Sequence, residues 1–179
     1  MNDKFDLNSI LGKEKTMLKK HFIPLALCIL VFVSTASTVQ AKSHPIQLSL
    51  VTPIQIFPET DSIAGFRFNL LYGRNVSVTG LDMGLVNHVT TGSFIGLQHG
   101  LVNVVDSDFM GGQHGGVNVT QGRCEGVQWG MVNYANEMSG VQFGFVNYAR
   151  KMKGFQIGLV NIIRQGGAFP VFPIVNWSF

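Results

Sequence analysis

G-F-Q-I-G-L-V-N, at residues 154–161, is the stretch that decides the fold, because the chain repeats its pattern many times. Residues 140–147 read G-V-Q-F-G-F-V-N, and further copies of G-x-Q-x-G-x-V-N begin at residues 126, 112, 96 and 80, the copy at 112 shifted by one residue. The closing asparagines, separated by 16, 15, 15, 14 and 14 residues, are Asn87, Asn103, Asn118, Asn133, Asn147 and Asn161. A step this short indicates one small structural unit that is stacked on, or paired with, copies of itself.

The repeated Gly, Gln and Asn positions are interpreted as structural repeat residues. They are Gly96, Gln98, Gly100, Asn103, Gln113, Asn118, Gly126, Gln128, Gly130, Asn133, Gly140, Gln142, Gly144, Asn147, Gly154, Gln156, Gly158 and Asn161. A degenerate copy begins at Gly65, 15 residues before Gly80, with Arg67 where Gln usually stands. In the copy that follows, Asp82 takes the place of Gln.

Composition and charge limit the classes of protein to which the chain can belong. Of its 179 residues, 21 are Gly, 46% are hydrophobic and only 13% are charged, which fits a β-rich domain. The formal charge of +3 comes largely from five Lys against three acidic residues in the first 41 positions, and the rest has eight Lys/Arg against seven Asp/Glu. A nearly neutral domain has no electrostatic footprint for nucleic acid.

Residues 1–41 read as an N-terminal extension and a secretory signal peptide, followed by a single β-repeat domain at 42–179. Lys19 and Lys20 precede an apolar run at 22–33, and Val39 and Ala41 fit the small residues before a cleavage site. Met17 fits an ordinary signal start better than Met1. The alternatives are an N-terminal anchor helix, for which the run is short, and lipidation at Cys28.

Cleavage after Ala41 would leave Cys124 as the only cysteine, so no disulfide could form within the mature chain. A lone cysteine in an exported chain could be reactive, could pair with a cysteine of another chain, or could be a small apolar residue at a strand start, and we expect the last for Cys124.

Turn-forming polar pieces separate the copies and leave strands of about ten to twelve residues, such as 138–149 and 152–163. Alternation gives each strand two faces. In residues 152–163, one face carries Gly154, Gln156 and Gly158, while the other carries large apolar side chains together with Asn161. The fold is therefore all-β, since no helical period appears and frequent Gly disfavours a helix.

Two all-β architectures fit this pattern. The first, which we favour, is an antiparallel meander or small β-barrel of about eight or nine strands, with the apolar face toward lipid and the Gly/Gln face inside. The second is a β-solenoid with one repeat per coil, in which Gln stacks on Gln and Asn on Asn while the apolar face fills the interior. A lipid-facing apolar surface predicts detergent dependence, and a buried one predicts a soluble protein.

The repeats, the segment at 65–73 and the F-P-I-V-N ending at 172–176 resemble the bacterial surface-repeat protein family, catalogued in spirochaetes and found in other Gram-negative bacteria. Residues 168–179 are also similar to the C-terminal strand of outer-membrane β-barrels, since apolar residues alternate up to Phe179, although Pro170 and Pro173 depart from that pattern. The resemblance implies export and a location in the outer membrane or at the cell surface, or alternatively secretion or a periplasmic location. It implies no activity, cofactor or catalytic residue.

Few residues suggest chemistry. His99 and His114 share one repeat offset and could share a metal, but apolar residues occupy that offset in other copies, so we expect tolerated variants. His88 stands at the offset of the later tyrosines and is expected to replace an aromatic side chain. Asp106 and Asp108 lie together in a turn, where weak calcium binding is the alternative to simple solvation.

Sequence motifs of the familiar enzyme classes are missing: the chain contains no G-x-S-x-G, Walker loop, H-E-x-x-H or C-x-x-C. The expected protein is thus a non-enzymatic envelope or surface β-repeat protein with a structural or interaction role, whose partner is outer-membrane lipid or a cell-surface molecule. The alternatives are a secreted β-solenoid binding module and, less favoured, a small barrel enzyme acting on lipids.

Overall fold

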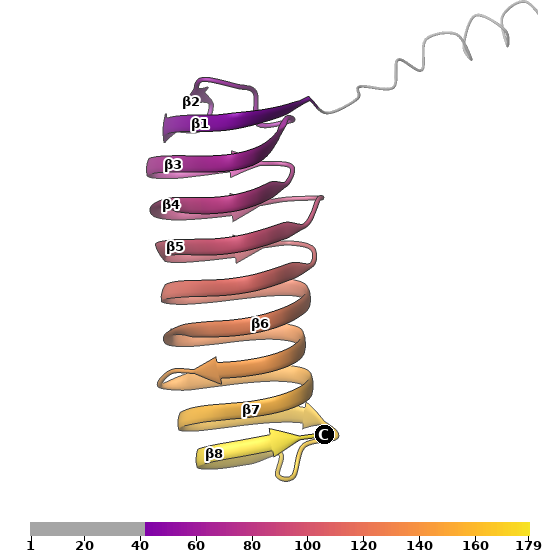
Figure 1. The fold of residues 1–179 in the computed structure, drawn as a ribbon. Helices are drawn as coiled ribbons and strands as arrows, with labels where there is room; N and C mark the ends of the chain where they lie inside the picture. Colours follow the sequence, from indigo (N-terminus) through magenta and orange to yellow (C-terminus); the bar gives the residue numbers. More distant parts are fainter. Residues whose placement is uncertain (1–41) are drawn as a thin grey trace, which may run out of the picture. The chain divides into compact units, whose positions relative to one another are not determined.

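The computed structural model describes residues 42–179, which form a β-solenoid of about eight turns (Figure 1). Its elements are β1 (Ser43–Val51), β2 (Ile54–Gln55), β3 (Ser62–Asn75), β4 (Val78–Val89), β5 (Phe94–Val105), β6 (Phe109–Phe143), β7 (Val146–Gln165) and β8 (Val171–Ser178). They make one sheet in the order β2-β1-β3-β4-β5-β6-β7-β8. Because β6 and β7 continue around more than one coil, the chain winds as a single ribbon.

The predicted signal peptide, the start at Met17 and the alternative lipidation of Cys28 lie outside the described residues. Residues Ala41–Phe179 form one compact unit. Within the described part, no helix is long and apolar enough to cross a membrane.

Successive coils pair in parallel and in register. β4 and β5 align Gly80 with Gly96 and Asn87 with Asn103, and β6 and β7 align Asn133 with Asn147. The predicted all-β class is therefore confirmed, in the solenoid form that the sequence offered as its alternative. The favoured antiparallel arrangement is wrong for every pair from β1–β3 to β6–β7.

The physical reason lies in which side chains each arrangement brings together. Parallel, in-register stacking places identical residues above one another about 4.8 Å apart, so amide side chains can bond in continuous ladders. Antiparallel neighbours would run the repeat in opposite directions, and Gln98 would then not face Gln113. The strands have nearly the predicted length, but each bends around a coil instead of running straight.

Antiparallel pairing occurs only at the two ends of the solenoid. β2 pairs with β1, and β8 pairs with β7. Pro53 lies between β1 and β2, and Pro170 directly precedes β8, which are positions where a missing N–H does not interrupt the parallel ladder. The predicted C-terminal strand is thus an end strand that covers the last coil.

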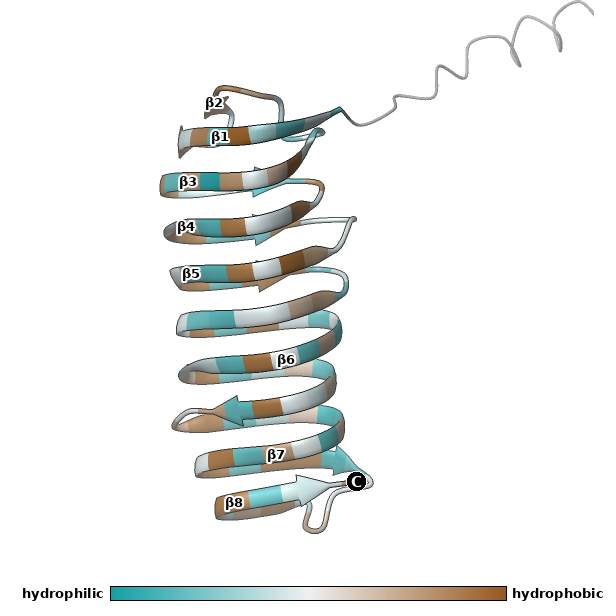
Figure 2. Ribbon diagram, in the orientation of Figure 1, coloured by the Kyte–Doolittle hydropathy of each residue, from teal (hydrophilic) through white to brown (hydrophobic). Residues whose placement is uncertain are grey.

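Polar amides, together with a smaller set of apolar residues, fill the interior. Buried Gln and Asn side chains form two rows. Two rows of buried apolar residues lie beside them, one with Phe94, Phe109 and Cys124 and the other with Val89 and Val105. Large apolar residues such as Trp129 and Leu159 are exposed instead, so residues of opposite hydropathy alternate along each strand (Figure 2). The expectation that a solenoid would bury its apolar face was wrong.

A bend within each coil explains why Gln and Asn are both inside. Gln156 and Asn161 are five residues apart, so in a straight strand they would point to opposite faces. The chain turns at Gly158, and alternation starts again after the turn, so both amides point inward with 0% exposure. The expected placement of Asn161 on the apolar face was wrong for this reason.

Candidate binding surface: the apolar edge

The corner of each coil is built on glycine. A Cβ atom on Gly130 would lie 2.4 Å from the carbonyl oxygen of Gly115 and 2.6 Å from Nδ2 of Asn118. Both distances are shorter than van der Waals contact permits, so a side chain there would push the coils apart. The same corner row contains Gly84, Gly100, Gly115, Gly144 and Gly158.

A second glycine row lies near the start of each copy. Gly126 has φ +131°, and a Cβ there would lie 2.0 Å from the carbonyl oxygen of Gly111. Gly96, Gly140 and Gly154 repeat this conformation. The predicted repeat glycines are therefore places where the backbones of neighbouring coils approach closely.

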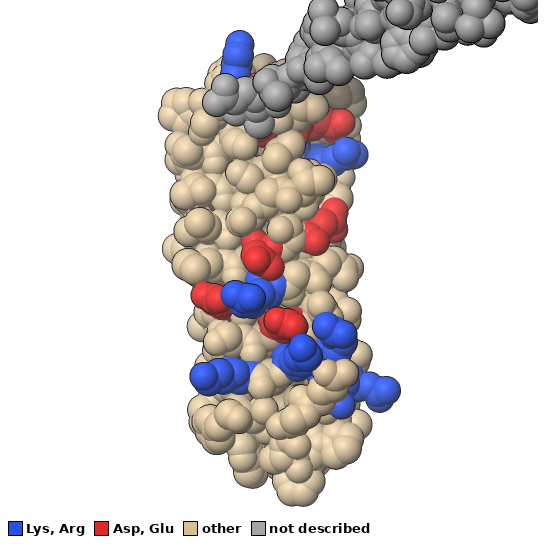
Figure 3. Space-filling view, turned by 90° about the vertical axis from the view of Figure 1, so that its right-hand side faces the viewer, with Lys and Arg blue, Asp and Glu red and all other residues tan. Residues whose placement is uncertain are grey.

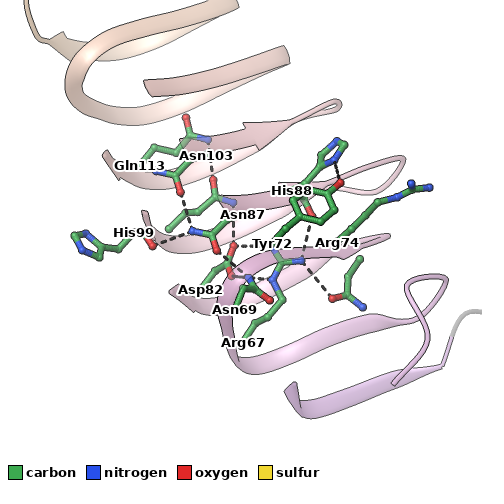
Figure 4. A network of polar contacts seen from close by, with 12 residues as sticks. Arg67, Asn69, Tyr72, Arg74, Asp82, Asn87, His88, His99, Asn103 and Gln113 are labelled. Atoms are coloured by element: carbon green, nitrogen blue, oxygen red, sulfur yellow. Dashed lines mark hydrogen bonds and ion pairs between the residues drawn. The ribbon is translucent and has the colours of Figure 1, made fainter. Parts of the chain in front are cut away.

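The repeat glutamines form one hydrogen-bonded ladder. Each amide nitrogen donates to the amide oxygen of the preceding coil, as from Gln128 to Gln113 and from Gln142 to Gln128, both at 2.7 Å. The ladder ends where Gln98 donates to a carboxylate oxygen of Asp82 at 2.9 Å. Asp82 also accepts two bonds of 2.7 Å from the guanidinium of Arg67, and both side chains are buried (Figure 4).

The repeat asparagines form a second ladder that runs in the opposite direction. Asn87 donates to Asn103 at 2.9 Å (Figure 4), and Asn103 donates to Asn118 at 2.8 Å, so each amide nitrogen bonds to the following coil. A second N–H of each amide bonds to a corner carbonyl, as from Asn118 to Trp129 at 3.1 Å. The interior amides thus hold the corners in place.

Two rows of outward side chains flank the corner glycines, and we call them together the apolar edge. The row before the corner is Phe68, Met83, His99, His114, Trp129, Phe143 and Ile157, and the row after it is Leu70, Leu85, Leu101, Gly116, Met131, Phe145 and Leu159. Many members are strongly exposed, including Trp129 at 56% and Leu159 at 67%. Neither row contains a Lys, Arg, Asp or Glu.

The C-terminal half of the apolar edge contains a groove of about 520 Å³. Its floor is the glycine row, and its walls are the two outward rows, with Ile174 of β8 at one end and His114 at the other. The groove exists because the corner glycines have no side chain, while large side chains project outward on both sides of them. It offers a ligand apolar contact and almost no hydrogen-bonding group.

Exposed charges lie on the opposite side of the coil, where one coil passes to the next, and we call this side the charged edge. Its residues are Asp106, Asp108, Arg123, Glu125, Glu137, Arg150, Lys151, Lys153 and Arg164, and Figure 3 shows charged side chains as a stripe along that side. Glu137 lies 3.3 Å from Lys151 and 3.9 Å from Arg150. The apolar and charged edges make the solenoid amphipathic.

The two candidate metal ligands do meet. His99 and His114 stack with ring centroids 4.8 Å apart, and their Nδ1 atoms are 2.7 Å apart. Within residues 42–179, no group of three or more His, Cys, Asp or Glu could hold a metal ion. The pair belongs to the row of side chains before the corner, where Trp129 packs edge-on against His114 with centroids 4.9 Å apart.

The candidate calcium ligands are engaged by the protein itself. Asp106 lies 2.8 Å from Nε2 of His88, and Asp108 accepts a 2.8 Å bond from the backbone N–H of Arg123. The hydroxyl of Tyr72 lies 2.9 Å from Nδ1 of the same histidine. This chain from Tyr72 to Asp106 was not predicted, because a register shift in β3 displaces Tyr72 from its repeat offset.

Cys124 is a free, fully buried thiol in the inward apolar row, as expected for a small apolar residue. Burial raises the pKa of Cys124 to about 12, with a smaller raising effect from Glu125 and an opposing hydrogen bond from Thr120. The thiol is therefore protonated and shielded at neutral pH, which makes it a poor nucleophile.

Neither protein-family models, nor curated proteins, nor solved structures are similar to this chain. A function for this protein is therefore inferred from the geometry of the apolar edge and from the sequence pattern.

Proposed function

We propose that this chain is an exported, non-enzymatic β-solenoid of the bacterial envelope or cell surface that binds a partner through its apolar edge. The observation that carries the proposal is the separation of exposed side chains into an apolar edge and a charged edge. Soluble monomers rarely expose a contiguous apolar surface of this extent, and such surfaces mark interaction sites.

Several side chains that could take part in chemistry are bonded to other residues or buried, and this supports a binding role. Asp82 is bonded to Arg67 in the interior, Asp106 to His88, and the thiol of Cys124 is buried. Stacked repeats also favour binding, because they present one extended surface built from many similar units.

The pattern of residues 1–41 supports export, and the G-x-Q-x-G-x-V-N repeats support membership of the surface-repeat family. A role in the envelope and a secreted binding module share this route and differ in whether the chain stays with the cell. The partner is then outer-membrane lipid or a cell-surface molecule, and nucleic acid does not fit the near-neutral domain.

Fractionation of cells that express the full chain tests the proposal. We expect the mature protein in the envelope fraction of a Gram-negative host, with an N-terminus at Lys42 by N-terminal sequencing. Ala41→Arg should block cleavage, because a large charged residue cannot occupy the position before the cut, whereas Gln40→Ser should be processed normally. Retention of unprocessed chain in the cytoplasm would refute export, and release of all mature chain to the medium would favour the secreted module.

A further inference from the structure

The shape of the apolar edge limits the kinds of partner that can cover it. The two rows run from β3 to β7, and exposed apolar residues continue past the corner onto Val132 and Val160, at 40% and 39% exposure. The surface therefore faces more than one direction along the whole described solenoid. A second copy related by a twofold axis would cover a single facing patch and leave the rest in water.

We infer that the apolar edge inserts into the acyl-chain region of a lipid layer, with the solenoid axis parallel to the layer and the charged edge in water. The inference rests on the proposed function and names the partner of the same surface. It parallels the way an amphipathic helix lies at a membrane surface, with its apolar side among the chains and its charged side in water.

Backbone hydrogen bonding permits this insertion. Polar backbone groups in hydrocarbon must be bonded within the protein. In the solenoid, the strands on both sides of the corner pair with the neighbouring coils, so their backbone bonds run along the axis. At the corner itself, the N–H of Val160 donates to the carbonyl of Phe145 at 2.9 Å, and the N–H of Gly144 donates to the carbonyl of Ile157 at 3.0 Å. The interior amides of Asn118 and Asn133 are likewise bonded at the corner, to the carbonyls of Trp129 and Phe143.

Charge distribution sets the orientation. Within each later coil the charged positions, such as Lys153, come before the first apolar row, and the corner lies between the two apolar rows. Insertion of the corner leaves Lys153 and Arg150 on the water side, where their long side chains stay hydrated. Insertion of the opposite side would place exposed cations such as Arg164 among acyl chains, which is unfavourable.

The two tryptophans allow a site-specific test in the full chain, even though residues 22–33 are also apolar. Trp129 belongs to the apolar edge and Trp177 to β8, so Trp177→Phe leaves Trp129 as the only tryptophan, whose emission can be excited selectively. We expect phosphatidylethanolamine and phosphatidylglycerol vesicles to shift its emission to shorter wavelength. Lipids brominated along the acyl chain should quench it.

The matched control moves the fluorophore to the charged side. Trp129→Phe/Trp177→Phe/Gln121→Trp places a single tryptophan at an exposed position that precedes Arg123. We expect no quenching of this tryptophan by the same brominated lipids. Equal quenching of both tryptophans would overturn the proposed orientation.

Charge substitutions on the edge provide a second test by vesicle flotation. Phe145→Glu and Met131→Glu change side chains that are 56% and 58% exposed, so the fold should be retained by circular dichroism. Each should lower the vesicle-bound fraction of the solenoid by about tenfold or more, because an apolar group leaves hydrocarbon and a charge replaces it. Asn136→Glu, on the charged side, should leave binding unchanged.

Failure of this inference is distinguishable from failure of the proposed function. An exported chain whose Trp129 is not quenched would retain its envelope role but lose the lipid partner. Emission that shifts with protein concentration in the absence of vesicles, again without quenching, would assign the edge to a second copy and overturn the inference. Quenching in a chain that is not exported would overturn the envelope role alone.

Discussion

The first coils and the later coils of the solenoid fill the same inward row in different ways. In β5, β6 and β7, the row consists of five glutamines joined in one direction: Gln98, Gln113, Gln128, Gln142 and Gln156. In β3 and β4, the equivalent positions hold Arg67 and Asp82 as a buried ion pair. The difference lies at the donor end of the glutamine ladder, where Gln98 bonds to the carboxylate of Asp82 in place of a further amide.

A one-way ladder leaves a donor at one end and an acceptor at the other. At the N-terminal end, Asp82 takes the donated N–H of Gln98 and is neutralised by Arg67. At the C-terminal end, the amide oxygen of Gln156 has no hydrogen-bond partner among residues 42–179. Within the described part of the chain, the amide oxygen of Asn69 is the unpartnered group at the opposite end of the asparagine ladder, as expected for a ladder that runs the other way.

Removal of the arginine should have the largest effect on stability. Arg67→Met leaves the Asp82 carboxylate buried without its cation, which should lower the free energy of unfolding by about 3–5 kcal/mol. Urea unfolding followed by circular dichroism measures the loss. Arg74→Met is the control, because that arginine is 45% exposed and lies 3.7 Å from Glu59, so its loss should change stability by less than about 0.5 kcal/mol.

The double variant Arg67→Gln/Asp82→Gln removes both charges and extends the glutamine ladder by two members. We expect its stability to return to within about 1 kcal/mol of the natural chain, because replacing a whole buried pair is often neutral. A double variant as unstable as Arg67→Met would mean that Asp82 does more than end the ladder.

A break in the middle of the ladder should have a smaller effect. Gln128→Leu removes a donor to Gln113 and to the carbonyl of Tyr134, and an acceptor for Gln142, so we expect a loss of about 1–3 kcal/mol in urea unfolding. Gln156→Leu should be milder by about 1 kcal/mol, since its oxygen already lacks a partner. Equal losses at the two positions would contradict the directional ladder.

The repeat made the β class, the stacking of like residues and the structural role of its Gly, Gln and Asn predictable. The choice between a solenoid and an antiparallel sheet was not predictable, because both use strands of similar length with alternating faces. The deciding feature is the bend at Gly158, which depends on how closely it approaches the coil before it: a Cβ there would lie 1.9 Å from the carbonyl oxygen of Gly144. That distance arises only after the coils have stacked.

The buried ion pair is a feature that the sequence could have predicted. Arg67 and Asp82 both replace Gln at the same repeat offset, 15 residues apart, with opposite charge. In a stacked solenoid, this spacing makes the two residues neighbours. In the favoured antiparallel sheet they would not be neighbours, so an ion pair between them was not predicted. The exposure of the apolar edge was missed in the solenoid alternative because binary patterning assumes that apolar faces are buried.

The buried thiol of Cys124 should make the stability of the middle coils depend on pH, and this is the smallest of the expected effects on the free energy of unfolding. Its pKa is raised to about 12 in the folded chain from a reference of 9.0, so the unfolded chain loses the proton first as pH rises. The contribution of the buried thiol to the free energy of unfolding is complete below about pH 9 and is lost between about pH 9 and 12. The loss is about 1 kcal/mol at pH 10. Cys124→Ala should therefore show a shallower fall in unfolding free energy between pH 8 and 10 than the natural chain, and parallel curves would mean that the thiol ionises equally easily in both states.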